Sequence, residues 1–310
     1  MVIPCYNEEE NISLMIKAVL SRFEQELQDY DYELIFIDND SSDGSRSILR
    51  AECSKNHKVK AIFNAKNFGQ FNSPYYALLQ SAGDCVILLC CDFQDPVELI
   101  PRMVREWENG NKIIVMQKDH SEENKLMYFL RSCYYKMIHK FSNIEQIEHF
   151  TGFGLYDRSF IDVLRSLNDP MPFLRGIVAE LGFGIKIIPY TQRKRRAGKT
   201  SNNFATLYDA AMLSVTSYTK IGLRIATFMG FGVAFVSVFV ALVYFVLKLI
   251  YWDRFVAGTA PIVVGMFFLG AVVMIFLGIM GEYILAINQR LMNRPLVVES
   301  ERINFDDKAM

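Results

Sequence analysis

Acidic and amide side chains follow three short apolar runs near the start of the chain. Residues 4–8, 38–44 and 92–96 each come directly after such a run. If the runs are parallel strands, their carboxyl ends meet along one edge of a sheet, and the three segments share one crevice. Carboxylates in such a crevice suit a hard divalent cation, which binds through one or two carboxylates plus substrate phosphates. The pattern therefore predicts a cation site at this edge.

Two of these acidic positions also have structural interpretations. Asp95 precedes Pro96 and is followed three residues on by Glu98, a pattern that predicts a helix N-cap. Residues 43–44 are Asp-Gly, an ordinary turn signal. For both positions we favour the structural interpretation over a site.

Asp92, Gln94 and Asp38 are the stronger site candidates. Asp92 ends a wholly apolar run, where a carboxylate is costly without a partner, and Gln94 follows two residues later. For Asp38, a turn and a binding site fit the sequence equally well.

The residues that must position these side chains alternate between strand-like and helix-like patterns. This rhythm predicts an α/β fold with a doubly wound, mainly parallel sheet. We expect strands at residues 2–3, 34–37, 59–63, 85–91 and 113–116. We expect helices at residues 12–23, 45–51 and 74–82, the last with Ser73 as its N-cap and Pro74 at its first position.

Two long uncharged runs lie near the C-terminus. Residues 225–247 and 255–281 contain no Asp, Glu, Lys or Arg. At about 1.5 Å rise per residue, each run is long enough to cross a hydrocarbon core of roughly 30 Å. Buried helices of a soluble domain are the alternative, but such helices rarely stay uncharged on every face. We therefore expect a C-terminal hairpin of two transmembrane helices.

These features divide the chain into four predicted segments. They are a cytosolic catalytic domain at 1–203, an amphipathic juxtamembrane helix at 204–224, two transmembrane helices within 225–287 and a cytosolic tail at 288–310. Basic residues cluster before the first run and after the second, so the positive-inside rule places both termini in the cytosol. The start lacks a charged segment followed by an apolar stretch, so no signal peptide is expected.

Charge and cysteine content exclude some classes of protein. The net charge of −1 provides no basic field for nucleic acid. The six cysteines form no C-x-x-C pair, and we expect them to be small core residues in a reducing compartment.

The ordered set of motifs resembles glycosyltransferase family 2, which has the GT-A fold. More narrowly, it is similar to the polyprenyl-phosphate sugar transferases, a group that includes dolichyl-phosphate mannose synthase and the bactoprenol glucosyltransferases. The matching pieces lie at residues 2–9, 36–44, 67–69, 92–98 and 195–199, followed by the predicted hairpin. They cover nearly the whole chain in the order of the family.

The resemblance implies donor-binding roles for the matched positions. The nucleoside of a nucleotide-sugar is implied to contact Pro4, Tyr6, Glu8 and Asp38. Asp92 and Gln94 are implied to bind Mg²⁺ or Mn²⁺ on the donor diphosphate, where the cation acts as a Lewis acid. Arg195 is implied to reach the same diphosphate, because its planar fork suits phosphate oxygens.

The resemblance also implies an acceptor site. Lys118, Arg131 and Ser132 lie where the family places groups that receive the lipid phosphate, although a solvated helix face explains Arg131 about as well. The implied catalytic residues are Asp92, Arg195 and Arg131. The basic residues 193–196 also fit a plain anchor beside anionic lipid, and the two roles are compatible.

The chain departs from the family pattern at three places. It begins almost inside the first strand, so that strand is expected to be short or the sequence truncated. Cys90 replaces the first Asp of an Asp-x-Asp pair, so the cation site is expected to rest on Asp92, Gln94 and the donor. Residues 152–154 are Gly-Phe-Gly where some relatives have Asp-Phe-Arg. Loss of that Asp is tolerable if the acceptor is a phosphate, which is already anionic and needs no general base.

The expected function is inverting transfer of one sugar, with UDP-glucose as donor and undecaprenyl phosphate as acceptor. The product is a lipid-phosphate sugar for modification of cell-envelope glycans. The expected location is the cytosolic leaflet of the bacterial inner membrane, in which the protein is multi-pass.

Three other hypotheses remain. A processive polysaccharide synthase would carry Gln-x-x-Arg-Trp, but residues 192–196 contain no Trp. A catalytically inactive scaffold that binds nucleotide or lipid in the membrane is motivated by Cys90 and Gly152. Self-association of the membrane helices through small residues is the third, at Gly270, Gly278 and Gly281.

Overall fold

The computed structural model describes most of the chain as two compact units. The described residues are 1–119, 147–193, 195–196, 212–213, 221–250, 259–292 and 294–305. The first unit comprises Met1–Lys136, Ile144–Asn203 and Met292–Met310, and the second comprises Met137–Asn143 and Phe204–Leu291.

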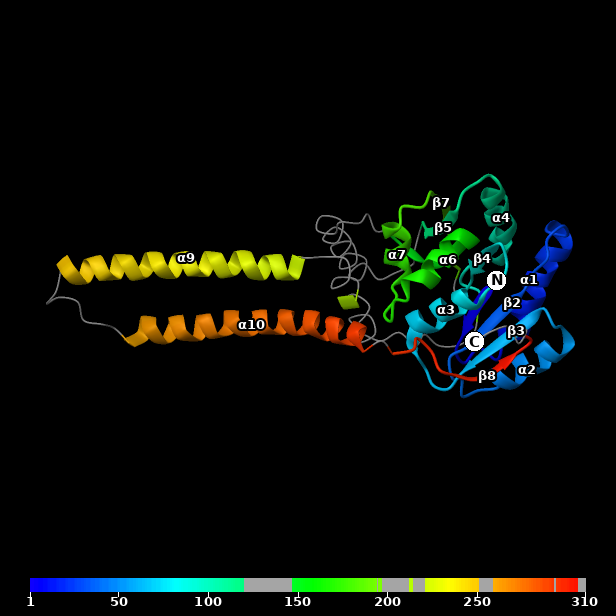
Figure 1. Ribbon diagram of the computed structural model, residues 1–310, viewed down its shortest axis with the longest axis horizontal. Coiled ribbons are helices and arrows are strands. Elements are labelled where there is room, and N and C mark those ends of the chain that lie inside the picture. The colour runs from blue at the N-terminus through cyan, green and yellow to red at the C-terminus, as the bar shows by residue number, and fades with distance from the viewer. Residues whose placement is uncertain are drawn as a thin grey trace. The chain divides into compact units, whose positions relative to one another are not determined.

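The first unit is built on a mixed sheet (Figure 1). Among the described residues the sheet has eight strands in the order β7-β5-β6-β4-β1-β2-β3-β8. The strands are β1 (Val2–Cys5), β2 (Leu34–Asp38), β3 (Val59–Asn64), β4 (Cys85–Leu88), β5 (Ile113–Lys118), β6 (Phe150–Asp157), β7 (Ile185–Tyr190) and β8 (Glu299–Ile303). The run β3-β2-β1-β4 is parallel, as is the pair β5–β7, whereas β6 and β8 are antiparallel to their neighbours.

Helices cover both faces of this sheet. They are α1 (Ile12–Glu26), α2 (Ser45–Lys55), α3 (Gly69–Gln80), the 3₁₀ turn η1 (Val97–Leu99), α4 (Ile100–Glu108), α6 (Arg158–Leu167) and α7 (Leu174–Glu180). Side chains alternate across a strand, so Phe36 packs into one core cluster while Ile35 and Ile37 pack into the other. Every residue of β2 is buried, as expected for a central parallel strand. The predicted doubly wound, mainly parallel architecture is confirmed over this part of the chain.

Several element boundaries differ from the sequence prediction, including the start of α3 and the end of β4. Helix α3 begins at Gly69, five positions before the expected start, and Pro74 lies inside it. Ser73 is buried and its hydroxyl accepts a hydrogen bond from Asn64 Nδ2 (3.1 Å), so it does not cap the helix. Strand β4 ends at Leu88, which is its last residue paired with β1 and β6, rather than at residue 91.

The segment predicted as a tail, 288–310, contributes to the sheet. Its strand β8 pairs antiparallel with β3, and the backbone N–H of Ala65 donates to the carbonyl of Val298 (2.9 Å). The side-chain amide of Asn304 donates to the carbonyls of Cys53 and Val59, both at 2.8 Å. The C-terminal residues are therefore part of the same compact unit as the N-terminal residues.

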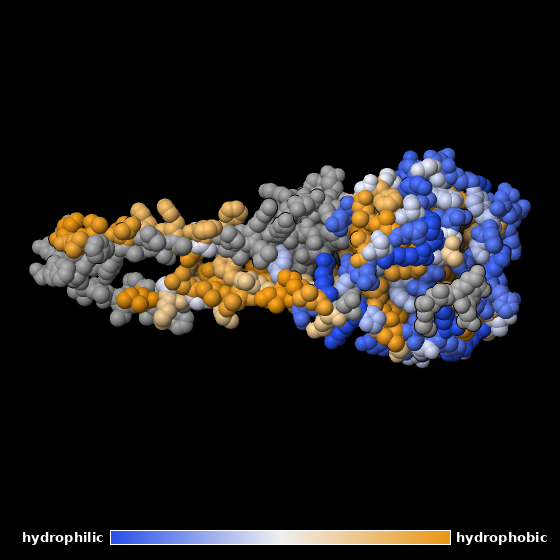
Figure 2. All heavy atoms as spheres, in the orientation of Figure 1, coloured by the Kyte–Doolittle hydropathy of each residue, from blue (hydrophilic) through white to orange (hydrophobic). Residues whose placement is uncertain are grey.

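The second unit contains the long helices α9 (Ile221–Ile250) and α10 (Thr259–Leu291). Figure 2 shows hydrophobic residues along both helices. Within the described residues, the segment Phe268–Leu291 is long and apolar enough to cross a membrane by length and composition, and none of it is buried. The predicted juxtamembrane helix at 204–224 falls largely outside the described residues.

Asp157 gives the first unit a predicted dependence of stability on pH. Its carboxylate caps α6 by accepting the backbone N–H of Ser159 (3.0 Å), and it also accepts Trp107 Nε1 (2.7 Å). Burial alone would raise the pKa of Asp157, but hydrogen bonds from Ser159, Trp107 and Lys112 outweigh it and lower this pKa to about 2. The stabilisation is present above about 3.9, the pKa of an unfolded Asp, and is lost as the pH falls through the folded value.

We therefore expect acidification from about pH 5 to about pH 2 to remove about 2 kcal/mol of unfolding free energy through this carboxylate. Denaturant unfolding of the full chain over a pH series measures the effect. Asp157→Asn is expected to be less stable at neutral pH and to show a shallower pH dependence. Equal slopes in the two proteins contradict the assignment.

Candidate active site

The loops after β1 and β2 are joined at the carboxyl edge of the sheet. The backbone N–H of Asn7 donates to Ser41 Oγ (2.8 Å), and that of Ser42 donates back to Asn7 Oδ1 (2.8 Å). The backbone N–H of Glu8 donates to Ser45 Oγ at the start of α2 (2.9 Å). Asp43 accepts backbone N–H groups of Glu9 and Ser45, so its predicted role in the turn is confirmed.

Arg195 joins the loop after β1 to the loop after β4. Its Nη2 atom lies 3.0 Å from Glu8 Oε1 and 3.2 Å from Asp92 Oδ2, and its Nε also donates to Asp92 Oδ2 (3.2 Å). Both carboxylates are almost buried, with exposed fractions of 6% for Glu8 and 7% for Asp92. The predicted convergence of the three strand-end segments is thereby confirmed.

Burial shapes the electrostatics of this pair of acids. It raises the pKa of Glu8, while a hydrogen bond from Asn11 Nδ2 (2.6 Å) and the charge of Arg195 partly offset the effect. Asp92 Oδ1 accepts the backbone N–H of Gln94 (3.1 Å). Between them Phe93 has a φ of 58°, a left-handed conformation that is uncommon outside glycine. The strained turn lets the Asp92 carboxylate bond back to its own loop while it faces Arg195.

Asp38 lies deeper, at the end of β2, and is fully buried. Its Oδ2 accepts Arg46 Nε (2.7 Å) and the backbone N–H of Ser41 (3.1 Å). Its Oδ1 is buried and has no hydrogen-bond partner within the described residues. The bond from the Ser41 N–H is that of a turn, and the binding role of Asp38 stays a prediction.

We expect Arg46→Gln to lower the free energy of unfolding by about 3 kcal/mol, because it leaves the Asp38 carboxylate buried without its ion pair. The matched control is Arg50→Gln, one turn further along α2. Arg50 pairs with Glu301 at an exposed position, and its loss is expected to cost less than about 1 kcal/mol. Denaturant unfolding compares the two variants, and equal losses contradict the role given to Arg46.

Asp95 does not cap a helix, so that prediction is wrong. Its Oδ1 accepts the phenol of Tyr190 at the end of β7 (2.6 Å), and the residue before η1 is Pro96, without a side-chain cap. Burial raises the pKa of Asp95, and the Tyr190 hydrogen bond and the charge of Lys118 partly offset this effect. Sequence reasoning missed Tyr190, because no strand was predicted at residues 185–190.

The predicted acceptor residues are only partly described. Lys118 ends β5, and its Nζ donates to Gln192 Oε1 (2.8 Å) in the segment that leads to Arg195. Its charge also acts on Asp95, which accepts the phenol of Tyr190 on the neighbouring strand β7. Arg131 and Ser132 lie outside the described residues.

The remaining predicted donor residues surround the same edge. Pro4 is half-buried within β1, where it pairs with Ile37, and Tyr6 is exposed. Gln94 is half-buried, and its carbonyl accepts the backbone N–H of Arg193 (3.1 Å).

The sequence did not reveal an amide network that follows β2 and β3. Within it, Asn39 Nδ2 donates to Asn67 Oδ1 (2.9 Å).

The described residues offer few ligands for a cation. Among the described residues, no group of three or more His, Cys, Asp or Glu side chains is arranged to hold a metal ion. Cys90 is exposed, contrary to the prediction that it is a core residue. Asp92 remains as a carboxylate at the crevice, which fits the mode in which Mg²⁺ takes one or two carboxylates and completes its shell with phosphates and water.

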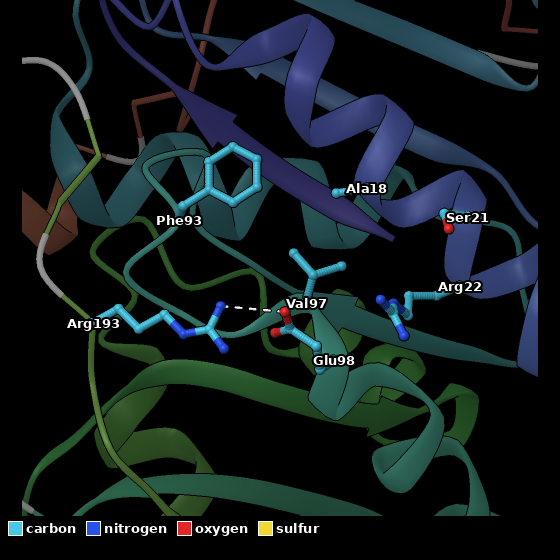
Figure 3. A pocket seen from close by; sticks show the side chains of 7 residues that line it. All are labelled: Ala18, Ser21, Arg22, Phe93, Val97, Glu98 and Arg193. Carbon is cyan, nitrogen blue, oxygen red and sulfur yellow. Dashed lines mark hydrogen bonds and ion pairs between the residues drawn. The ribbon is translucent and has the colours of Figure 1, made fainter.

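A small cavity lies beside Phe93 (Figure 3). It has a volume of about 100 Å³, and it is lined by Ala18, Ser21, Arg22, Phe93, Val97, Glu98 and Arg193. Ligand sites usually enclose roughly 300–1,000 Å³, so this cavity is too small for a nucleotide-sugar. Arg193 pairs with Glu98 across it (3.2 Å). The ion pair and the Arg193–Gln94 backbone bond hold the segment that carries Arg195.

The backbone of β6 explains both glycines of the Gly-Phe-Gly sequence at residues 152–154, where some relatives have Asp-Phe-Arg. Gly152 has a φ of 106°, which L side chains rarely adopt. A Cβ on Gly154 would fall far inside van der Waals contact of the Ile114 carbonyl oxygen on β5. An Asp and an Arg at these positions therefore do not fit the β6 backbone.

Comparison with known proteins finds one family. Residues 1–164 match the family model "Glycosyl transferase family 2". A "Prophage bactoprenol glucosyl transferase homolog" of Escherichia coli (strain K12) is 31% identical over 92% of each chain. The "Bactoprenol glucosyl transferase" of Shigella phage SfII is 30% identical over 98% of each chain.

Among solved structures, mannosyl-3-phosphoglycerate synthase from Rubrobacter xylanophilus matches 69% of this chain and 70% of its own, at 15% identity and a TM-score of 0.49. The family match covers the strands and loops that bring Glu8, Asp38 and Asp92 to one edge of the sheet. The chain belongs to glycosyl transferase family 2 and is a glycosyltransferase.

Proposed function

We propose that the protein transfers a single sugar from a nucleotide-sugar to a polyprenyl phosphate, with inversion at the anomeric carbon. UDP-glucose and undecaprenyl phosphate are the proposed substrates, and the product is a lipid-phosphate sugar. The observation that carries the proposal is the convergence of Asp92, Glu8 and Arg195 in one crevice at the strand ends. Relatives named bactoprenol glucosyl transferases, similar over nearly the full chain, support this acceptor class.

The chain's own residues bind and orient the donor. Asp38 serves the nucleoside site from its buried position at the end of β2, where Arg46 keeps its carboxylate in place. Arg195 binds the diphosphate and stabilises the charge that grows on it as the sugar leaves. Mg²⁺ or Mn²⁺, when bound at Asp92 with Gln94 beside it, supplies Lewis-acid stabilisation to the same diphosphate.

The acceptor needs no proton removed. A phosphate oxygen of the lipid attacks the anomeric carbon, the bond to the nucleoside diphosphate breaks, and a β-linked product forms. Lys118 at the end of β5 and Arg131 are proposed to bind the incoming phosphate. The glycines at 152 and 154 agree with this chemistry, because a hydroxyl acceptor would require a general base in the crevice.

The pairing of β8 with β3 supports two membrane crossings. The chain leaves the sheet-containing unit before α9 and returns to it after α10, so both ends of the connecting segment lie on one side of any membrane. A single crossing by α10 would leave β8 on the opposite side from β3. We therefore propose two crossings, with α9 as the second span and with the termini and catalytic unit in the cytosol.

Epitope tags at the two termini test this topology in intact spheroplasts. Protection of both tags from external protease, with digestion of both after lysis, is the expected result. Digestion of one tag alone in intact spheroplasts contradicts the two-span arrangement.

An extraction assay tests the function. The purified full chain is incubated with undecaprenyl phosphate, Mg²⁺ and a panel of labelled UDP- and GDP-sugars, and products are extracted into organic solvent. Label from one donor in an acid-labile lipid is expected. Nucleotide binding without any lipid product favours an inactive scaffold, and a long water-soluble polymer favours a synthase.

A further inference from the structure

Arg195 contacts two acidic side chains at once. Two carboxylates that are nearly buried, Glu8 and Asp92, share a single nitrogen of its guanidinium, at 3.0 Å and 3.2 Å. Burying two like charges this close is costly unless a cation lies between them. In the donor-free chain, Arg195 supplies that positive charge.

The bonds of Asp92 account for both of its oxygens. Oδ1 accepts the backbone N–H of Gln94, and Oδ2 accepts Arg195. A divalent cation binds a carboxylate through the same oxygen lone pairs. A cation at Asp92 therefore competes with the Arg195 bonds to Oδ2 and meets the repulsion of a guanidinium positive charge a few ångströms away.

The loop that carries Arg195 is held on the crevice by its own contacts. The backbone N–H of Arg193 donates to the Gln94 carbonyl, and Lys118 contacts Gln192. Glu8 gives Arg195 a second carboxylate, so the guanidinium has an anchor that does not depend on Asp92. Arg195 thus contacts both carboxylates before a donor arrives.

We propose that Arg195 is an internal stand-in for the divalent cation, which holds Asp92 in the donor-free protein and must leave it before a cation binds there. This inference rests on the proposed cation at Asp92. The exchange couples the two ligands, because a donor diphosphate offers Arg195 new oxygens at the moment the cation takes Asp92. Cation binding without donor is weak for this reason, and it strengthens when the diphosphate is present.

Binding of Mn²⁺ alone tests the proposal without any turnover. Free Mn²⁺ is measured by electron paramagnetic resonance in titrations of the detergent-purified full chain. Arg195→Gln is expected to tighten the Mn²⁺ dissociation constant at least about tenfold, which corresponds to about 1.4 kcal/mol. The double variant Arg195→Gln with Asp92→Asn is expected to lose the gain, which assigns it to Asp92.

Arg196→Gln is the matched control for charge. Arg196 is the next residue, is exposed, and its guanidinium lies over the Phe93 ring at 5.7 Å. The substitution removes the same charge from the same loop without freeing either carboxylate, so it is expected to leave Mn²⁺ affinity near that of the wild type.

The outcomes separate the inference from the function on which it rests. Equal Mn²⁺ affinity in wild type and Arg195→Gln, with binding that depends on Asp92, overturns the stand-in role and leaves the cation site intact. An equal gain in the Arg196→Gln control also overturns it, because a general charge effect then explains the result. Absence of saturable Mn²⁺ binding in every variant overturns both the stand-in role and the proposed cation at Asp92.

Discussion

Replacing Asp92 with asparagine is expected to lower the rate of sugar transfer by about 10²- to 10³-fold, the cost of losing one preorganised electrostatic group. The asparagine keeps an oxygen that can accept the Gln94 N–H, so the turn at Phe93 is retained. What it loses is the negative charge that Arg195 contacts and that the proposed cation would bind. The extraction assay with the preferred donor measures the rate, and circular dichroism checks the fold.

Asp43→Asn is the matched control for this prediction. Asp43 lies in the loop after β2, at the same edge of the sheet. Its carboxylate accepts backbone N–H groups of Glu9 and Ser45. Its loss is expected to affect the turn and to leave the transfer rate near that of the wild type. Similar losses of rate in both variants contradict the special role of Asp92, and full activity of Asp92→Asn removes it from the mechanism.

The part of the site predicted best is the part that lies beside regular strands. Residues 34–38 are wholly apolar up to Asp38, so both the strand and the position of the acid at its end follow from the pattern. Once parallel strands are inferred, the meeting of the loops at one edge is a geometric consequence. The convergence of the loops that hold Glu8, Asp38 and Asp92 could therefore be predicted from the sequence.

The pairings between side chains that are distant along the chain could not be predicted from the sequence. Arg195 lies 187 residues from Glu8 along the chain, and Tyr190 lies 95 residues from Asp95. A local pattern cannot distinguish Asp95 as a helix cap from Asp95 as the acceptor of a buried phenol, because the deciding atom comes from β7. Resemblance to the family assigned Arg195 to a diphosphate, but not to the two acids that it contacts here.

Strand β8 was missed for a different physical reason. Its residues Glu299–Ile303 are mostly charged or polar, and none is fully buried. An edge strand pairs through its backbone on one side only and needs no apolar face, so hydrophobic alternation gives no signal. The start of α3 was also predicted wrongly. The prediction placed Pro74 at the first helical position, whereas Pro74 lies inside the helix.

The largest effect on stability is expected at Gly154, in β6. This residue pairs with Leu88 of β4 on one side and with Val115 of β5 on the other. A Cβ there would overlap the Ile114 carbonyl oxygen and lie 3.4 Å from the Ile114 carbonyl carbon and 3.5 Å from Val115 Cα. These are backbone atoms of a central strand, which cannot rotate away as a side chain would.

We therefore expect Gly154→Ala to cost about 3 kcal/mol, near the upper end for overpacking. For a unit of this size that corresponds to a fall of roughly 10 °C in the thermal midpoint, which circular dichroism of the full chain measures. Gly184→Ala is the matched control, because a Cβ at Gly184 has no atom within 4 Å and φ there is not positive. An equal thermal midpoint for the two variants contradicts the close approach of β6 and β5.

A second close approach on β6 connects the fold to the proposed chemistry. Gly152, two residues earlier on β6, has a Cβ position 3.4 Å from the Leu88 side chain, at the end of the strand that leads to Asp92. Restoring the relatives' pattern with Gly152→Asp and Gly154→Arg is expected to destabilise the unit at least as much as Gly154→Ala, without adding a working base. A stable double variant that gains transfer to a hydroxyl acceptor overturns this link between a glycine-built strand and a phosphate acceptor.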